Sequence, residues 1–439
     1  MKRLIPLFAV AALATGLAQR AEYPGPTILS RGLGTVLQGG GELLRLRPYL
    51  SLNGVYDTGL TAVSVDSSGN IRDQAGYGGR AEFGVSGYHN WRYTLLGIDY
   101  RGDFRHYSRS TYYDGSDHSL SLGVTHQISR QWAFTLRQAA GTLSRDYGAY
   151  NGYAFFEPSY ANVPMNELFN ARTNYLSSLG DLTYSPNPRL SFNLGGPGML
   201  VRRRSRALAG VTGYSARGDV QYRLSRSLAL GADYQYSHYD FTRSFGESDT
   251  HTVAVDLAIQ LGRYWTLGLR GGGARVEALG LQRVAVDPII AAILGPTTGL
   301  EVFYRVNYVP ALGVKLSRAF RRSSISLNID TGVSPGNGIY LTSRYQNAGV
   351  GYSYTAFRRW NFGLSSNYTK YGSVGQALGR YQSYSAGGGF SCQVNGWMHV
   401  VGRYDARRQD VANSSFIRTA HGVSLGVAFS PGTLPLSLW

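Results

Sequence analysis

The side chains that could do chemistry in this chain are charged residues that recur at every second position. One run places Asp99, Arg101, Asp103 and Arg105 on the same side of an extended segment. Acids and arginines that alternate on one face can pair across neighbouring segments. An arginine without such a partner attracts carboxylate or phosphate groups. The pattern therefore predicts a charged, solvated surface with a modest preference for anions.

In an extended segment, every second side chain points to the same face. This rule, applied to each segment, selects a larger set of inward-facing residues. The predicted pore-lining residues are Asp99, Arg101, Asp103, Arg105, Arg137, Asp219, Arg223, Asp233, Asp256, Arg270, Lys315, Asp330, Arg403, Asp405 and Arg407, and Asp181 and Asn328 share their parity. An alternative is that these charges form a structural ladder that plugs the interior.

Catalytic chemistry is not favoured by the sequence. Histidines at positions 106, 118, 238 and 251 are expected near one rim, where a membrane-embedded hydrolase could use them. No recognisable spacing joins them to a nucleophile. No metal-ligand cluster or nucleotide-binding loop is evident either. We therefore expect no enzyme activity, no catalytic residue, no metal and no cofactor.

The segments that must position these charges have the period of β-strands. Between Val253 and Leu261, Val, Leu and Ile alternate with Ala, Asp and Gln, a pattern that a helix would not hold. No segment after the N-terminus approaches the roughly 20 consecutive apolar residues of a spanning helix. The 57 Gly, 33 Tyr and 17 Phe are typical of membrane β-barrels.

Short turns set the expected number of strands. They lie at 89–91, 129–132, 186–189, 225–227, 262–265, 318–321, 357–360 and 394–397. Successive turns are roughly 37 to 58 residues apart, which fits two membrane strands and one longer loop. We predict an all-β fold, a closed antiparallel transmembrane β-barrel of about 18 strands, with 16 as the next possibility.

Tryptophans mark one end of the predicted hairpins. They stand where strands leave short turns, and Trp concentrates at membrane interfaces. The predicted periplasmic aromatic girdle consists of Trp91, Trp132, Trp265, Trp360 and Trp397. Both chain termini are expected on the same, periplasmic side.

The N-terminus predicts export. Residues 1–18 have the basic start, apolar stretch and small residues of a cleavable signal peptide. Residues 19–42 are expected to be a flexible periplasmic leader, too short for a folded plug, and residues 43–439 the barrel. Export also disfavours nucleic acid as a partner of the 43 Lys and Arg residues.

Three long loops have distinctive compositions. The longest, from Ser144 to Arg172, is predicted either to fold inward as a constriction or to lie over the rim. Its predicted constriction residues are Tyr147, Tyr150, Tyr153, Phe155, Phe156, Glu157 and Tyr160. A loop from Glu277 to Gly299 carries an apolar stretch at 289–294 that could form a subunit contact or a second inward flap. Arginines at 202, 203, 204 and 206 could bind lipopolysaccharide phosphates or attract an acidic substrate.

Taken together, the signal peptide, the alternation of short turns and long loops, and a last strand that ends on aromatic residues resemble bacterial outer-membrane barrels of the porin type. The resemblance covers the mature chain as architecture, and no short motif identifies a subfamily. It implies a channel for small hydrophilic solutes, anionic or sugar-like, in the outer membrane of a Gram-negative-type bacterium. The alternative is a pore for polysaccharide export. Lipid, lipopolysaccharide and other copies of the chain are the further expected partners.

Overall fold

The described part of the chain is built from β-strands. The computed structural model describes residues 45–60, 74–108, 114–143, 172–206, 208–285, 298–320, 322–335, 341–354, 359–374, 380–411 and 417–430. The strands are β1 (Arg45–Leu60), β2 (Gln74–Asn90), β3 (Thr94–Tyr107), β4 (Gly115–Gln127), β5 (Trp132–Leu143), β6 (Thr173–Asn187), β7 (Leu190–Arg203), β8 (Gly210–Arg223), β9 (Leu228–Thr242), β10 (Gly246–Leu261), β11 (Trp265–Ala285), β12 (Thr298–Ala319), β13 (Ser323–Ser334), β14 (Ser343–Tyr354), β15 (Trp360–Ser373), β16 (Tyr381–Gln393), β17 (Met398–Val411) and β18 (Ile417–Phe429). Across these ranges, no helix has the length and apolarity needed to cross a membrane.

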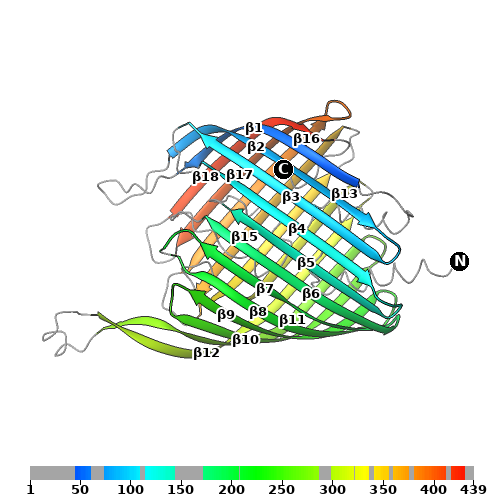
Figure 1. Ribbon diagram of the computed structural model, residues 1–439, viewed down its shortest axis with the longest axis vertical. Coiled ribbons are helices and arrows are strands. Elements are labelled where there is room, and N and C mark those ends of the chain that lie inside the picture. The colour runs from blue at the N-terminus through cyan, green and yellow to red at the C-terminus, as the bar shows by residue number, and fades with distance from the viewer. Residues whose placement is uncertain are drawn as a thin grey trace.

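The 18 strands form one closed antiparallel barrel. Each strand pairs with its neighbours in sequence, and β18 pairs with β1, for example through Leu52 and Val427. The closed sheet has no free edge, so every strand is paired on both sides. Figure 1 shows the tilted strands wrapping around a common interior. The predicted fold class and the count of 18 strands are confirmed, and the alternative of 16 strands was wrong.

The two ends of the barrel differ in how the strands are joined. Each of the eight predicted short turns falls between an even-numbered strand and the strand that follows it. These strand ends define one end of the barrel, which we call the tight-turn end, and β1 starts there. The opposite, long-loop end carries the connections that follow odd-numbered strands. The five predicted girdle tryptophans all lie at the tight-turn end, and Trp91 and Trp397 are half or more exposed.

Two strands are longer than predicted. We expected a loop from Glu277 to Gly299, but β11 and β12 pair without interruption from Trp265↔Arg318 to Ala285↔Thr298. The prediction was wrong because it assumed that each strand is only as long as the membrane is thick. In this hairpin the backbone hydrogen bonds between β11 and β12 continue beyond the rim of the barrel. The hairpin projects at the lower left of Figure 1. The apolar stretch 289–294 lies outside the described residues.

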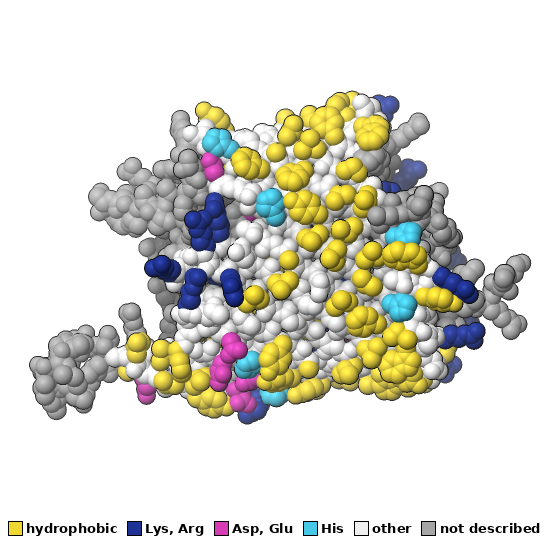
Figure 2. Space-filling model, in the orientation of Figure 1, with side chains coloured by type: hydrophobic (Ala, Val, Ile, Leu, Met, Phe, Trp, Pro, Cys, Tyr) yellow, Lys and Arg dark blue, Asp and Glu magenta, His cyan; other side chains and the backbone are white. Residues whose placement is uncertain are grey.

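The outer surface of the barrel is apolar. Side chains that the parity assigns outward are exposed, such as Leu194 at 66% and Leu425 at 60%. Figure 2 shows these side chains as a band across the visible face, with charged residues gathered toward its two ends. Such a band is what a bilayer core requires of a barrel.

Glycines opposite aromatic rings explain why the chain is rich in both. In the register of neighbouring strands, a ring repeatedly lies over a glycine whose missing side chain leaves room for it. Pairs of this kind are Tyr49–Gly84, Phe83–Gly102, Tyr107–Gly78, Tyr175–Gly141, Tyr239–Gly213, Phe303–Gly280, Tyr345–Gly332 and Phe390–Gly402. The rings brace the sheet across strands.

Replacing Gly84 by Ala is expected to lower the free energy of unfolding by about 1 to 2 kcal/mol, because overpacking forces neighbours apart. A Cβ at this position would lie 2.4 Å from the carbonyl oxygen of Tyr100 and 2.7 Å from the ring of Tyr49. Gly79→Ala in the same strand is the matched control, since a Cβ there meets nothing within 4 Å. Urea unfolding from lipid vesicles measures both. Equal stability of the two variants would contradict the bracing role of Tyr49.

Candidate functional site

The interior of the barrel is the candidate site, because the inner face of the strands gathers the chain's charges. The register places the predicted pore-lining residues on the face opposite the apolar band. The first charged wall, as we call it, comprises the inner faces of β17, β18 and β1 to β4. A second charged wall comprises those of β6 to β11. The inner faces of β14 to β16 form a third, neutral wall.

The first charged wall is a network of acids and arginines. Arg80 Nε lies 2.9 Å from carboxylate oxygens of both Glu82 and Asp103. Arg105 joins Asp103 at 3.3 Å to Asp117 at 2.5 Å. Asp103 and Asp117 thus each meet an arginine on a neighbouring strand, whereas Glu82 meets Arg80 on its own strand. These ion pairs offset the cost of removing the charges from water. The predicted pairing of acids with arginines is confirmed here.

A second part of this wall spans the closure of the barrel. Arg407 Nη2 on β17 donates to Asp57 Oδ2 on β1 at 2.7 Å, and Arg407 Nε lies 3.5 Å from Asp405. Between these strands, β18 places the small residues Ala420 and Gly422 at the same level. The long guanidinium side chain can therefore reach over β18 to the first strand.

The second charged wall repeats this arrangement on another side of the barrel. Arg270 Nη2 donates to Asp233 Oδ2 at 2.8 Å, and Arg217 lies 3.3 Å from Asp181. Asp219 accepts a hydrogen bond of 3.1 Å from the amide of Asn193. The two charged walls present acids and arginines at several levels along the barrel axis.

The sequence analysis did not predict the neutral wall, because it selected pore-lining residues by their charge. Its described inner-face residues are uncharged, and many carry hydroxyl or amide groups. Asn347 Nδ2 donates to Asp330 Oδ1 at 3.1 Å, and Asn367 Nδ2 donates to Thr369 Oγ1 at 3.0 Å. Buried rings of Tyr345 and Tyr371 pack toward its long-loop end. Alternation of Asn, Ser and Thr with apolar residues was the available signal.

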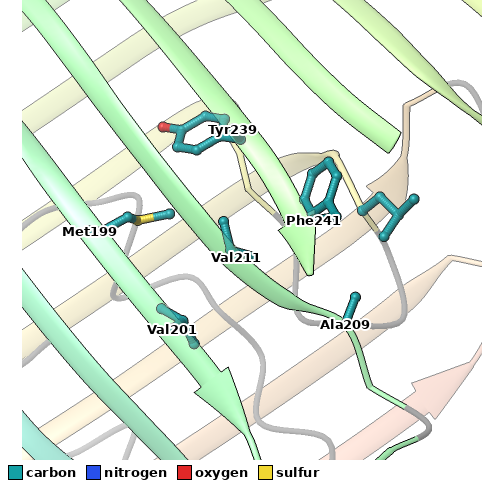
Figure 3. Packing of buried hydrophobic residues seen from close by; sticks show 7 residues of the cluster. Met199, Val201, Ala209, Val211, Tyr239 and Phe241 are labelled. Carbon is teal, nitrogen blue, oxygen red and sulfur yellow. The ribbon is translucent and has the colours of Figure 1, made fainter. Parts of the chain in front are cut away.

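Near the long-loop end, the inner face of β7 to β9 carries an apolar cluster. Figure 3 shows the cluster, in which side chains of β7, β8 and β9 gather on one side of the sheet. Its members are Met199, Val201, Ala209, Val211, Tyr239, Phe241 and Leu341. Leu341 lies just before β14, and its side chain packs against those of β7–β9.

Arg203 stands at the end of β7, next to this cluster. Its side chain is 2% exposed, and Nε donates to the carbonyl oxygen of Ala209 at 3.0 Å. Nη1 and Nη2 have no hydrogen-bond partner among the residues that the structure describes. Arg203 lies beyond the apolar band, and its burial lowers its pKa to about 10. A buried guanidinium with free donors is a strong anion ligand.

The remaining predicted site residues have different positions. Arg223 lies at the tight-turn end, where it donates to the carbonyl oxygens of Ser225 and Arg226 at 3.1 and 3.2 Å. Lys315 is on the inner face opposite Asn328. The predicted constriction residues from Tyr147 to Tyr160 lie outside the described residues. The pore-lining role of the charged residues stays a prediction.

The rim histidines are held by tyrosines and aspartates. His118 and His251 lie on the outer face, where each Nδ1 is hydrogen-bonded to a tyrosine hydroxyl, of Tyr100 at 3.1 Å and of Tyr234 at 2.8 Å. His106 Nδ1 lies 2.7 Å from Asp114. These contacts anchor the rings on the barrel surface.

Known proteins resemble this chain in their structures and not in their sequences. No family model matches the chain, and no curated protein matches it. Solved structures with a similar outline include Pseudomonas aeruginosa OccK5 (OpdH), with 13% identity and a TM-score of 0.42 over 89% of this chain and 98% of that chain. Acinetobacter baumannii OccAB4 has 10% identity and a TM-score of 0.40 over 88% and 98%.

A third similar structure is that of a complex with a sugar acid. P. aeruginosa OccK2 (OpdF) in complex with glucuronate has 10% identity and a TM-score of 0.43 over 89% of this chain and 98% of that chain. A structural similarity this low does not identify a substrate for the present chain. Its own fold is a closed 18-stranded antiparallel barrel.

Proposed function

We propose that this protein is a channel through which small hydrophilic solutes diffuse across the outer membrane of a Gram-negative-type bacterium. The observation that carries the proposal is a closed 18-stranded barrel with an apolar outer band and an inner face of charges, amides and hydroxyls. Barrels of 16 to 18 strands are wide enough to enclose an aqueous channel. The two charged walls and the neutral wall would line that channel.

We infer that the favoured solutes are anionic or sugar-like. The two NH2 groups of Arg203 have no acceptor within the described part of the chain, which suits a carboxylate. The hydroxyl and amide groups of the neutral wall suit sugar hydroxyls. In this proposal the tight-turn end, with its tryptophans, faces the periplasm together with both termini, and the long-loop end faces outside.

Single-channel recording in a planar bilayer tests this function. We expect stepwise, steadily open conductance from the purified barrel and a reversal potential displaced toward anions in a salt gradient. A barrel that stays silent until a polysaccharide or partner is added would contradict the diffusion channel and support the export alternative.

The Lys315→Glu variant is expected to shift selectivity toward cations. A charge at about 6 Å contributes about 0.7 kcal/mol in water, so a two-unit change alters local ion concentrations by at most about tenfold and, after salt screening, a few-fold. Lys370→Glu is the matched control, because the register places Lys370 on the outer face opposite Gln346 and Gln382. Reversal potentials in a KCl gradient measure both. An equal shift in the two variants would exclude Lys315 from the conduction path.

A further inference from the structure

One cluster of metal-binding side chains lies outside the barrel interior. It belongs to the β9–β10 hairpin at the long-loop end, on the outer face and beyond the apolar band. His238 and Asp240 lie on β9, and the register sets them directly opposite Asp249 and Glu247 of β10. Four metal-ligating groups thus occupy one two-by-two block of the sheet. In Figure 2 a group of acidic and histidine side chains lies between two apolar areas toward the long-loop end.

The ligand atoms converge on one point. Single ligand atoms of His238, Asp240 and Glu247 all lie within 4.8 Å of one another. His238 Nε2 is 3.4 Å from Asp240 Oδ2, close to the separation of about 3.3 Å between two ligands of a tetrahedral zinc ion. The Asp240 side chain is 59% exposed, so rotation of the carboxylates can close the remaining distance.

The imidazole is oriented as metal-bound histidines usually are. His238 Nδ1 donates to Asp249 Oδ1 at 2.9 Å, which leaves Nε2 to face the Asp240 carboxylate, where a metal ion could bind between them. The hydroxyl of Tyr236 donates to the same Asp249 oxygen at 2.6 Å and holds that carboxylate in place. A carboxylate on the second ring nitrogen is the usual support of a metal-ligating histidine, because it fixes the tautomer and raises the basicity of the ligand.

The pairing of β9 with β10 also favours a bound cation at this cluster. Asp240 and Glu247 are like charges directly opposite each other, a cross-strand pair that destabilises a sheet unless a cation lies between its members. The turn between them is fixed, since Arg243 adopts a φ of 66° and its Nη1 donates to the carbonyl oxygen of Arg203 at 2.9 Å. The two carboxylates are therefore held close together.

We propose that His238, Asp240 and Glu247 form a divalent metal site of the zinc class on the outer surface of the barrel, with Asp249 as a positioning residue. Imidazole with two carboxylates suits zinc better than calcium or magnesium, which prefer all-oxygen ligands. Three protein ligands leave a fourth position for water or for an anionic group outside the protein. The site is independent of solute transport through the interior.

Zinc titration of the folded, untagged barrel in detergent tests the proposal. Calorimetry should show one zinc ion bound per chain, and His238→Gln and Glu247→Gln should each abolish that binding. Asp249→Asn should weaken it by about 10- to 100-fold, the usual effect of losing a carboxylate behind a ligating histidine. X-ray absorption at the zinc edge should show one imidazole in the coordination shell.

His421→Gln is the matched control, because Tyr404 holds His421 Nδ1 at 2.8 Å on the same outer face in a comparable pair. This variant should bind zinc as the natural protein does. Heat-modified migration in gels verifies that each variant is folded. The proposal is overturned if the natural protein binds no zinc at millimolar concentration, if His238→Gln keeps full binding, or if calcium displaces zinc at equal concentration.

Discussion

Replacing Asp57 by Leu is expected to lower the free energy of unfolding by about 3 kcal/mol, because it leaves the buried Arg407 without its main partner. The Asp57 and Arg407 side chains are only 9% and 8% exposed, and their ion pair of 2.7 Å joins the first strand to the seventeenth. Urea unfolding from lipid vesicles, followed by tryptophan fluorescence, measures the loss. Conductance at neutral pH should persist in folded barrels.

The double variant Asp57→Leu/Arg407→Leu distinguishes a lost ion pair from a loss of packing. The double variant also removes the guanidinium that has lost Asp57, so we expect it to recover most of the stability lost in the single variant. Equal losses in the single and double variants would show that Arg407 is satisfied by Asp405 alone.

Arg203→Met is expected to raise the free energy of unfolding by about 1 to 3 kcal/mol, the opposite direction to most substitutions. Burial lowers the pKa of Arg203 to about 10, so the charged form is less stable in the folded barrel than in the unfolded chain. This penalty is present at neutral pH and disappears as the pH rises through 10 and above. Met preserves much of the side-chain volume beside the apolar cluster.

Although Arg203→Met should stabilise the barrel, it should weaken the binding of anions. We expect acetate to raise the melting temperature of the natural protein and to have little effect on Arg203→Met, because ligand binding to the folded state alone stabilises it. Arg202→Met is the matched control: it removes the same charge one residue away, from the exposed outer face. A destabilised Arg203→Met variant would show that the guanidinium contributes to the fold.

Local rules are enough to find the strands but not to find which side chains meet. His238 and Glu247 are nine residues apart and match no metal-binding spacing, which is why the sequence predicted no metal cluster. The register of the β9–β10 hairpin places them on one face. The neutral wall was missed for a similar reason, since Thr369 of β15 meets Asn347 only through the pairing of β15 with β14.

The sequence by itself determined the strand count, the closed antiparallel architecture and the face on which each strand residue lies. These depend on a period of two and on turn spacing, which are properties of the local chain. Tertiary structure decided the partners of inner charges, such as Arg407 with Asp57 across 350 positions. It also decided that Nη1 and Nη2 of Arg203 are buried without an acceptor among the described residues. Pairing depends on register, on barrel closure and on small residues such as Gly422 that let long side chains cross, and these arise only when all the strands are in place.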